Sequence, residues 1–396
     1  MPKHSSGKIP GWLWLMGALT ALGPLAIDMY LPAFPAIGVG LNAGQGEVER
    51  TLASYLFGLS LAQLVYGPVA DRFGRRLPLL FGLVVFTLSS IGCAFTQDIG
   101  HLTILRVIQA FGGAAGMVIP RAVIRDNLDT IEAAKALSLL ILIMGVMPIL
   151  GPIVGAQLMF VAGWRGLFGL MATVGLLLGI AAWRNMKESL PPEKKIPLNF
   201  RNIGSNYLAL VRDRQYLCYA LTGGFGSAGL FTYISGSPRV LMEVYHVEPQ
   251  YFGFLFGLNA AALIAMSQLS ARLLNRHSPE RLLHWAQNAL VVMALIGVVL
   301  TVAGWLNLWL FMVCLMGFMA CQGFVLPNSG ALALAKQGKR LGVASALMGT
   351  IQMLCGTFAG LAISSWHSDT ALPMTGLLLI SAALSWQFGR MATKRT

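Results

Sequence analysis

Long apolar runs alternate with short polar segments along the whole chain. Each run has about 20 residues, the length an α-helix needs to cross the hydrocarbon core of a bilayer. Lipid offers the backbone no hydrogen-bond partners, so uninterrupted runs of this length indicate helices. The pattern predicts an all-α membrane protein with twelve spans, at about 12–34, 47–70, 78–96, 102–124, 134–160, 163–184, 214–237, 250–272, 281–304, 306–327, 340–365 and 371–390.

One long polar stretch interrupts this pattern between the sixth and seventh spans. It is rich in proline and charge and includes the sequence from Lys187 to Lys195. Proline and charged residues at such density mark a linker. We therefore predict three parts: an N-terminal six-helix half at 1–184, a cytoplasmic linker at 185–213 and a C-terminal six-helix half at 214–396.

The two halves carry a weak internal repeat. Gly151-x-x-x-Gly155 in the fifth span matches Gly356-x-x-x-Gly360 in the eleventh. Related six-helix halves are typical of transporters, whose substrate site lies near the bilayer midplane between the repeats.

Basic charge is distributed unevenly between the two sides of the membrane. The net charge is +13, and with a cytoplasmic N-terminus all but four of the 28 Lys and Arg residues fall in cytoplasmic segments. The four exceptions are Arg50, Arg106, Arg165 and Arg239. This is the positive-inside rule, so it predicts a multi-pass protein of the bacterial inner membrane with both termini cytoplasmic. We expect a monomer in the lipid bilayer and no nucleic-acid partner.

Two charged residues fall at apolar depth. Asp28 is the one acid of the 15 that we place well inside a span, and Arg106 is the one such basic residue. A charge at the bilayer centre costs roughly 2.5–3.5 kcal/mol on insertion scales, so such residues usually face a cavity or a partner and usually function. The two charges lie at similar depth in their spans. We interpret Asp28 as a candidate proton carrier; a fixed structural ion pair with Arg106 is the alternative.

Two motifs bear on mechanism. The first, Gly67-Pro-Val-Ala-Asp-Arg-Phe-Gly-Arg-Arg76, joins the second and third spans. Its glycines, Gly67 and Gly74, permit a tight turn and close helix approach. Its charges, Asp71, Arg72 and Arg75, fit a latch that holds one conformation, although a basic loop that only sets topology is the alternative. The second motif, in the fifth span, contains Pro148, Gly151, Pro152 and Gly155, which bend a helix and leave one face free of side chains.

These motifs carry a family resemblance. The loop motif resembles the signature of the major facilitator superfamily, and the span-five motif resembles the signature of its antiporters, with Ala156 in place of the usual final glycine. Further stretches are similar to the Bcr/CflA (bicyclomycin/chloramphenicol-resistance) branch of drug:proton antiporters. They are Ile27–Ala33, Arg125-Asp126, Tyr233–Pro238 and Phe256–Ala260.

The resemblance implies two pseudo-symmetric six-helix halves around a central cavity. It also implies that Asp28 and Arg106 couple protons to substrate, and that Asp71, Arg72 and Arg75 form a cytoplasmic gate with Asp126. Polar residues on the predicted inward-facing spans are candidate substrate contacts, although helix–helix hydrogen bonding is an equal alternative. They are Tyr30, Tyr55, Gln63, Gln109, Tyr233, Ser235, Asn259, Gln322 and Gln352.

The sequence thus predicts a proton-coupled exporter of small hydrophobic antibiotics that works by alternating access. Export of an endogenous metabolite, such as an amino-acid derivative, nucleoside or siderophore, is the alternative. The six histidines show no metal-type spacing, and the five cysteines show no paired spacing. We therefore expect no enzyme activity, cofactor or metal.

Overall fold

The computed structural model describes residues 11–194, 200–366 and 368–393. Residues 1–10 of the predicted N-terminal half and 195–199 of the predicted linker lie outside these ranges.

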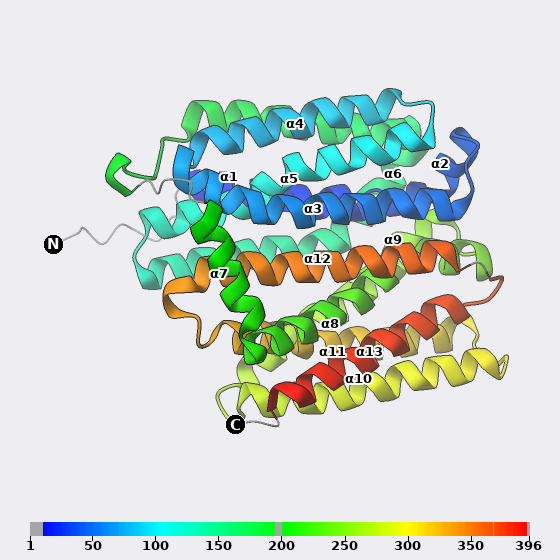
Figure 1. The fold of residues 1–396 in the computed structure, drawn as a ribbon. Helices are drawn as coiled ribbons and strands as arrows, with labels where there is room; N and C mark the ends of the chain where they lie inside the picture. Colours follow the sequence, from blue (N-terminus) through cyan, green and yellow to red (C-terminus); the bar gives the residue numbers. More distant parts are fainter. Residues whose placement is uncertain (1–10, 195–199, 367, 394–396) are drawn as a thin grey trace.

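Long helices run side by side through the molecule (Figure 1). The first half contains α1 (Gly11–Asp28), η1 (Leu31–Ala33), α2 (Phe34–Gly40), α3 (Gln45–Phe73), α4 (Arg76–Phe95), α5 (Ile99–Asn127) and α6 (Thr130–Asn185). Two short elements follow, η2 (Pro192–Lys194) and α7 (Phe200–Arg212). The second half contains α8 (Arg214–Arg239), η3 (Val240–Val244), α9 (Pro249–Leu273), α10 (Pro279–Val302), α11 (Leu308–Leu334), η4 (Gly338–Arg340), α12 (Leu341–Ser365) and α13 (Leu372–Thr393).

The described helices account for the twelve predicted crossings. Ten stretches are long and apolar enough to span a membrane, with Lys135–Asn185 of α6 counted as one. The backbone of α6 is non-helical at Gly163, where φ is 63°, so this element consists of two helices meeting at the predicted boundary of spans five and six. The remaining crossing, α8, is not among the ten; its sequence is rich in glycine, serine and threonine.

The first span departs from its prediction. We expected one helix over about 12–34, but α1 ends at Asp28 and the chain restarts as η1 and α2. Pro32 and Pro35 each lie at the start of one of these short helices. Proline lacks a backbone N–H and suits the first turn of a new helix better than the interior of an old one. The break places Asp28 at a helix end rather than within a helix.

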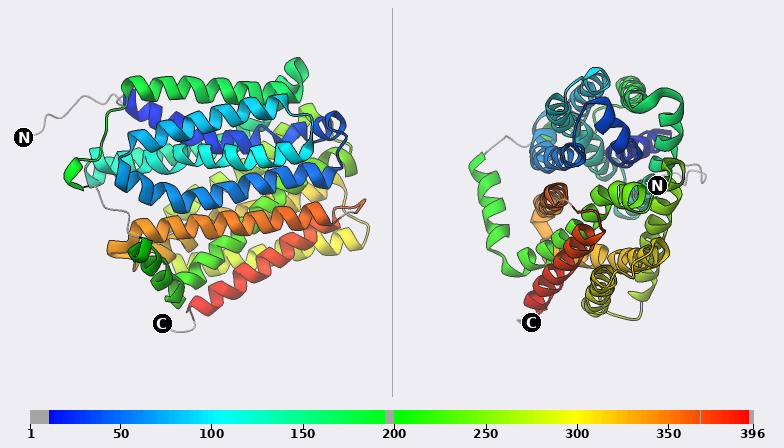
Figure 2. Two further views of the ribbon diagram at one scale, coloured as in Figure 1. Left: turned by 45° about the horizontal axis from the view of Figure 1, so that its top comes forward. Right: turned by 90° about the vertical axis from the view of Figure 1, so that its right-hand side faces the viewer.

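Two helical bundles are visible when the molecule is viewed along its helices (Figure 2). Helices α1–α6 form one bundle and α8–α13 the other, and they meet mainly where α3 packs on α12 and α6 packs on α9. In the first contact the Thr350 hydroxyl donates to the carbonyl of Ser60 at 3.2 Å. In the second, Gly253 lies so close to Ile153 that a Cβ would come within 3.0 Å of its backbone nitrogen.

Helix α7 was not anticipated in the polar linker. It lies across the end of the molecule at which α1 begins and α13 ends (Figure 1), and it packs against α8 and α12. Along the chain, α7 follows the end of α6 and precedes the start of α8, so it lies in the connection between the two bundles.

Candidate transport site and loop network

Asp28 is buried where α1 ends, with 2% of its surface exposed. Gly151 of α6 lies directly against it: a Cβ on Gly151 would come within 2.8 Å of the Asp28 Cβ and 3.3 Å of the Met29 nitrogen. One turn further along, a Cβ on Gly155 would collide with the Met29 carbonyl. The two motif glycines therefore provide the side-chain-free face on which the break after α1 packs.

Arg106 is fully buried in α5 and is held by neutral groups. Its guanidinium donates to the Gln109 side-chain oxygen at 2.7 Å and to the Ala26 carbonyl at 3.1 Å. It also lies over two aromatic rings, 4.5 Å from the centroid of Tyr30 and 4.2 Å from that of Tyr55. Cation–π contacts of this kind are stronger when the cation is desolvated.

Asp28 and Arg106 share a neighbourhood without forming an ion pair in the described part of the chain. The hydrogen bond from Arg106 to the Ala26 carbonyl holds the guanidinium close to the end of α1, since Ala26 lies two residues before Asp28. The chain just after Asp28 also contacts the other half, because η1 packs against α8 and α9. The structure thus lacks the fixed ion pair considered as an alternative, and the acid lies at the boundary of the two halves.

Four predicted substrate contacts bury a polar atom that has no hydrogen-bond partner among the described residues: Tyr55, Ser235, Asn259 and Gln322. The amide nitrogens of Asn259 and Gln322 donate to backbone carbonyls at 3.1 and 2.9 Å, which leaves their oxygens unpaired. Unsatisfied buried polar atoms are uncommon in folded proteins, so these four are the stronger candidates for ligand contact. The Thr232 hydroxyl is also buried without a hydrogen-bond partner among the described residues. It was missed because a single threonine in a helix does not by itself indicate a binding site.

Three other candidates already have hydrogen-bond partners within their own half. The Tyr30 hydroxyl is 2.7 Å from the Thr51 hydroxyl. Gln109 accepts from Arg106 and donates to Ser90 at 2.7 Å. Tyr233 donates to the Phe256 carbonyl at 3.2 Å, and the two rings stack.

The last two candidates are half-buried and lie against glycines of the opposing helix. Gln63 of α3 contacts Gly349 of α12, across the interface of the halves. Gln352 lies near Gly223 within the second half.

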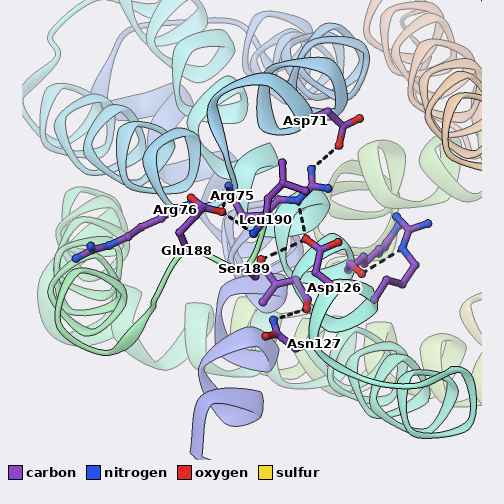
Figure 3. Close-up of polar contacts among 11 residues, drawn as sticks. Asp71, Arg75, Arg76, Asp126, Asn127, Glu188, Ser189 and Leu190 are labelled. Carbon is purple, nitrogen blue, oxygen red and sulfur yellow. Dashed lines mark hydrogen bonds and ion pairs between the residues drawn. The ribbon is translucent and has the colours of Figure 1, made fainter. Parts of the chain in front are cut away.

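Three of the four charged residues predicted to form a gate come together, two from the loop motif and one from α5 (Figure 3). Arg75 contacts Asp71 at 2.6 Å and Asp126 at 2.9 Å, and only 9% of its side chain is exposed. Burial lowers the pKa of Arg75, but hydrogen bonds and charge from Asp126 and Asp71 raise it above its ordinary value. Arg75 thus joins the end of α3 to the end of α5. Arg72 is exposed, and a Cβ added at Gly67 would have open space around it.

Glu188 and Ser189, just after α6, complete this network and were missed (Figure 3). The backbone N–H groups of Arg75 and Arg76 donate to the Glu188 carboxylate at 2.8 and 3.2 Å. The Ser189 hydroxyl donates to Asp126 at 3.2 Å. They were missed because a glutamate and a serine are common residues in a polar linker and form no motif there.

Gly74 explains how Glu188 reaches the start of α4. Its φ of 94° turns the chain after α3, and a Cβ at this position would collide with the Glu188 carboxylate. Burial raises the pKa of Glu188, but the backbone N–H groups of Arg75, Leu190, Arg76 and Ser189 lower it below its ordinary value. The start of the linker therefore caps α4 as an anion.

The chain belongs to the Major Facilitator Superfamily, whose sequence profile matches residues 16–389. The predicted superfamily and twelve-helix fold are thereby confirmed, and the chain is a membrane transporter rather than an enzyme. It is 36% identical over 374 residues to the uncharacterized MFS-type transporter YdgK of Bacillus subtilis, covering 94% of this chain and 92% of that protein.

Two further relatives have names that mention drugs. The bicyclomycin resistance protein homolog of Haemophilus influenzae is 29% identical over 378 residues, 94% of each chain. The multidrug resistance protein MdtL of Klebsiella pneumoniae is 29% identical over 370 residues, 93% of this chain and 91% of that one. These relatives confirm the resemblance to the bicyclomycin-resistance branch.

Solved structures share the fold. A bacterial homolog of the human lysosomal transporter Spinster, inward-facing and occupied, aligns with a TM-score of 0.75 at 14% identity over 97% of both chains. The xylose transporter XylE of E. coli, partially occluded and inward-open, aligns with a TM-score of 0.72 at 14% identity, over 96% of this chain and 98% of that one. At this identity the likeness concerns the fold alone.

Proposed function

We propose that this protein is a proton-coupled exporter of small hydrophobic antibiotics of the bicyclomycin or chloramphenicol kind. It would work as a monomer in a bacterial inner membrane, with both termini and α7 on the cytoplasmic side. The named bicyclomycin- and multidrug-resistance relatives support the substrate class. The distribution of basic residues supports the orientation.

The observation that carries the proposal is the position of Asp28. Its carboxyl group is buried at a helix break, is packed on Gly151 of the antiporter-type motif, and is not locked into an ion pair in the described ranges. An acid that must gain and lose a proton in every cycle needs this freedom, because a permanent ion pair would hold it ionised.

The proposed cycle alternates access to the two sides of the membrane. A proton from the periplasm neutralises Asp28 and weakens the site for its cargo, which leaves outward. Loss of that proton to the cytoplasm restores the site for the next molecule. Arg106 keeps the region positive when Asp28 is neutral, and the unpaired polar atoms of Tyr55 and Asn259 offer hydrogen bonds to the cargo from both halves.

The proton gradient is large enough to drive such export. One proton moving down roughly 150 mV supplies about 3.5 kcal/mol, at about 2.3 kcal/mol per charge per 100 mV. At about 1.4 kcal/mol per factor of ten, this supports a gradient of a few hundred-fold.

The test is drug transport in energised everted vesicles. The Asp28→Asn variant mimics the protonated acid, so it should bind drug weakly and lose proton-driven accumulation, whereas Asp28→Glu, which keeps an ionisable group, should retain part of it. Undiminished accumulation by Asp28→Asn would refute the coupling assignment. A susceptibility panel in an efflux-deficient host identifies the cargo, and protection against none of the antibiotics would refute the substrate class.

A further inference from the structure

A second acid is buried in the molecule, far along α3 from the loop network. Glu49 lies in the second turn of α3 and is only 1% exposed. Neither of its carboxyl oxygens has a hydrogen-bond partner among the described residues. Its sequence position carries no signal, because Glu49 lies at the edge of an apolar run, next to Arg50.

Glu49 faces the other half of the protein. It lines a small pocket with room for about one water molecule, between the start of α3 and the end of α8. Gln45 and Val48 line the pocket from the first half, and Pro238, Arg239 and Glu243 from the second. The pocket therefore lies at the junction of the halves, at the membrane face opposite the end where α1 begins (Figure 1).

The charged groups that face Glu49 are Arg239 and Glu243, both from the second half. Arg239 does not form an ion pair with Glu49 within the described ranges; its guanidinium donates to the carbonyls of Trp366 and Ser368 at 3.4 and 3.1 Å. Glu243 adds a second acid to the same pocket. Burial raises the pKa of Glu243, and the charge of Arg239 lowers it, with a net increase. The pocket thus holds two acids near one shared cation.

The packed junction suits a neutral Glu49. A carboxylate buried without hydrogen bonds or an ion pair is strongly disfavoured, whereas a protonated carboxyl group is tolerated far better. When the halves separate at this face, water reaches the pocket and stabilises the ionised form. Separation of the halves and release of a proton from Glu49 are therefore linked.

We propose that Glu49 is a second proton-binding site, distinct from Asp28, at the junction of the halves. Binding of a proton from the compartment at that face favours the packed junction, and loss of the proton favours its opening. Low pH on that side therefore closes the junction and high pH opens it. The inference rests on the proposed function only in requiring that the two halves separate at this face.

Distance measurements between spin labels test this directly. Labels at Val39 and Gln250, both exposed and on opposite halves at this face, report on the junction in nanodiscs without drug. We expect the ratio of short to long distances to fall as the pH rises from 5.5 to 8.5, by up to about tenfold per pH unit, the limit for one linked proton. No pH-dependent shift in the otherwise unmodified protein would overturn the proposal.

Matched variants assign the shift to Glu49. Glu49→Gln should hold the short distance across the whole pH range, and Glu49→Asp should recover a pH-dependent shift. Glu47→Gln is the control: Glu47 is exposed and caps α3 by accepting from the Gly44 N–H, and glutamine can replace it in that role. An unchanged shift in Glu49→Gln, or its loss in Glu47→Gln, would overturn the assignment.

The same labels separate this proposal from the exporter function. Asp28→Asn should abolish drug accumulation and leave the pH-dependent distance shift intact. If Asp28→Asn transports drug normally while Glu49→Gln loses the shift, the coupling assignment fails and the inference about Glu49 stands. If the shift depends on Asp28 instead, the inference fails.

Discussion

Two arginines show how the same side chain serves different purposes in different surroundings. Arg75 lies at a loop and is neutralised by two carboxylates. Arg106 lies at membrane depth and is held by a carbonyl, an amide and the faces of Tyr30 and Tyr55. These neutral partners leave its positive charge without an ion pair, as the proposed proton coupling through Asp28 requires.

The Arg106→Lys variant should lose most transport. An ammonium group cannot make the two in-plane donations while stacking between rings, so we expect a loss of about 1–2 kcal/mol of local interaction, or roughly tenfold in transport rate. Drug accumulation in vesicles checks this, normalised to the amount of folded protein. Arg50→Lys, at an exposed position, is the control and should transport normally. Equal activity of the two variants would contradict the role of Arg106.

At the scale of elements, glycines decide which helices approach closely. The antiporter-type motif lies in the first part of α6, where Gly151 and Gly155 leave room for the break after α1. Helix α4 depends on a different element: its first backbone N–H groups are capped by Glu188, which belongs to the segment after α6.

Gly155→Ala should destabilise the protein. A Cβ there collides with the Met29 carbonyl, and overpacking of this kind costs about 1–3 kcal/mol. Gly169→Ala, in the second part of the same element, is the control because nothing lies within 4 Å of its added methyl group. Thermal unfolding in detergent should show a lower midpoint for the first variant only. Equal midpoints would show that the contact in α6 is not tight.

The stability that Glu188 gives to the start of α4 should be lost only at low pH. The pKa of Glu188 is lower in the folded protein than its ordinary value of about 4.3. Its stabilising effect is therefore fully present above pH 4.3 or so and is lost as the pH falls through the lower folded value. Amide hydrogen exchange at Arg75 and Arg76, expressed relative to the intrinsic rate at each pH, should stay slow at pH 5–7 and accelerate in Glu188→Gln. An exchange rate that rises already between pH 7 and 5 would contradict this.

At the scale of the whole molecule, the two halves touch along α3 and α12 and along α6 and α9. Alternating access requires that contacts at one face separate while those at the other form. Ala53 and Gly360 lie on opposite halves, and a Cβ on Gly360 would come within 3.1 Å of that of Ala53.

A disulfide between these positions should stop transport. The Ala53→Cys/Gly360→Cys double variant, in a background with the five native cysteines replaced, brings two Cβ atoms close to disulfide distance. Oxidation should abolish drug accumulation, and reduction should restore it. Either single variant is the control and should respond to neither treatment. Full transport by the oxidised double variant would show that this contact need not open.

The sequence by itself determined the helical fold and its twelve crossings, and it singled out the charged residues at apolar depth. Apolar run length decides membrane crossing without reference to partners, so the spans were predictable, as was the division of α6 near Gly163. Asp28 and Arg106 were found because a lone charge in an apolar run is costly wherever its helix lies.

Tertiary structure decided the pairings. That Gly151 faces Asp28, that Arg106 stacks on Tyr30 and Tyr55, and that Glu188 caps α4 all depend on contacts between residues distant in the chain. Glu49 illustrates the limit: its sequence neighbours place it at the end of a span, and only the packing of α8 against it buries the carboxyl group. A single charge gives a local energetic signal, whereas its partner is chosen by how the helices assemble.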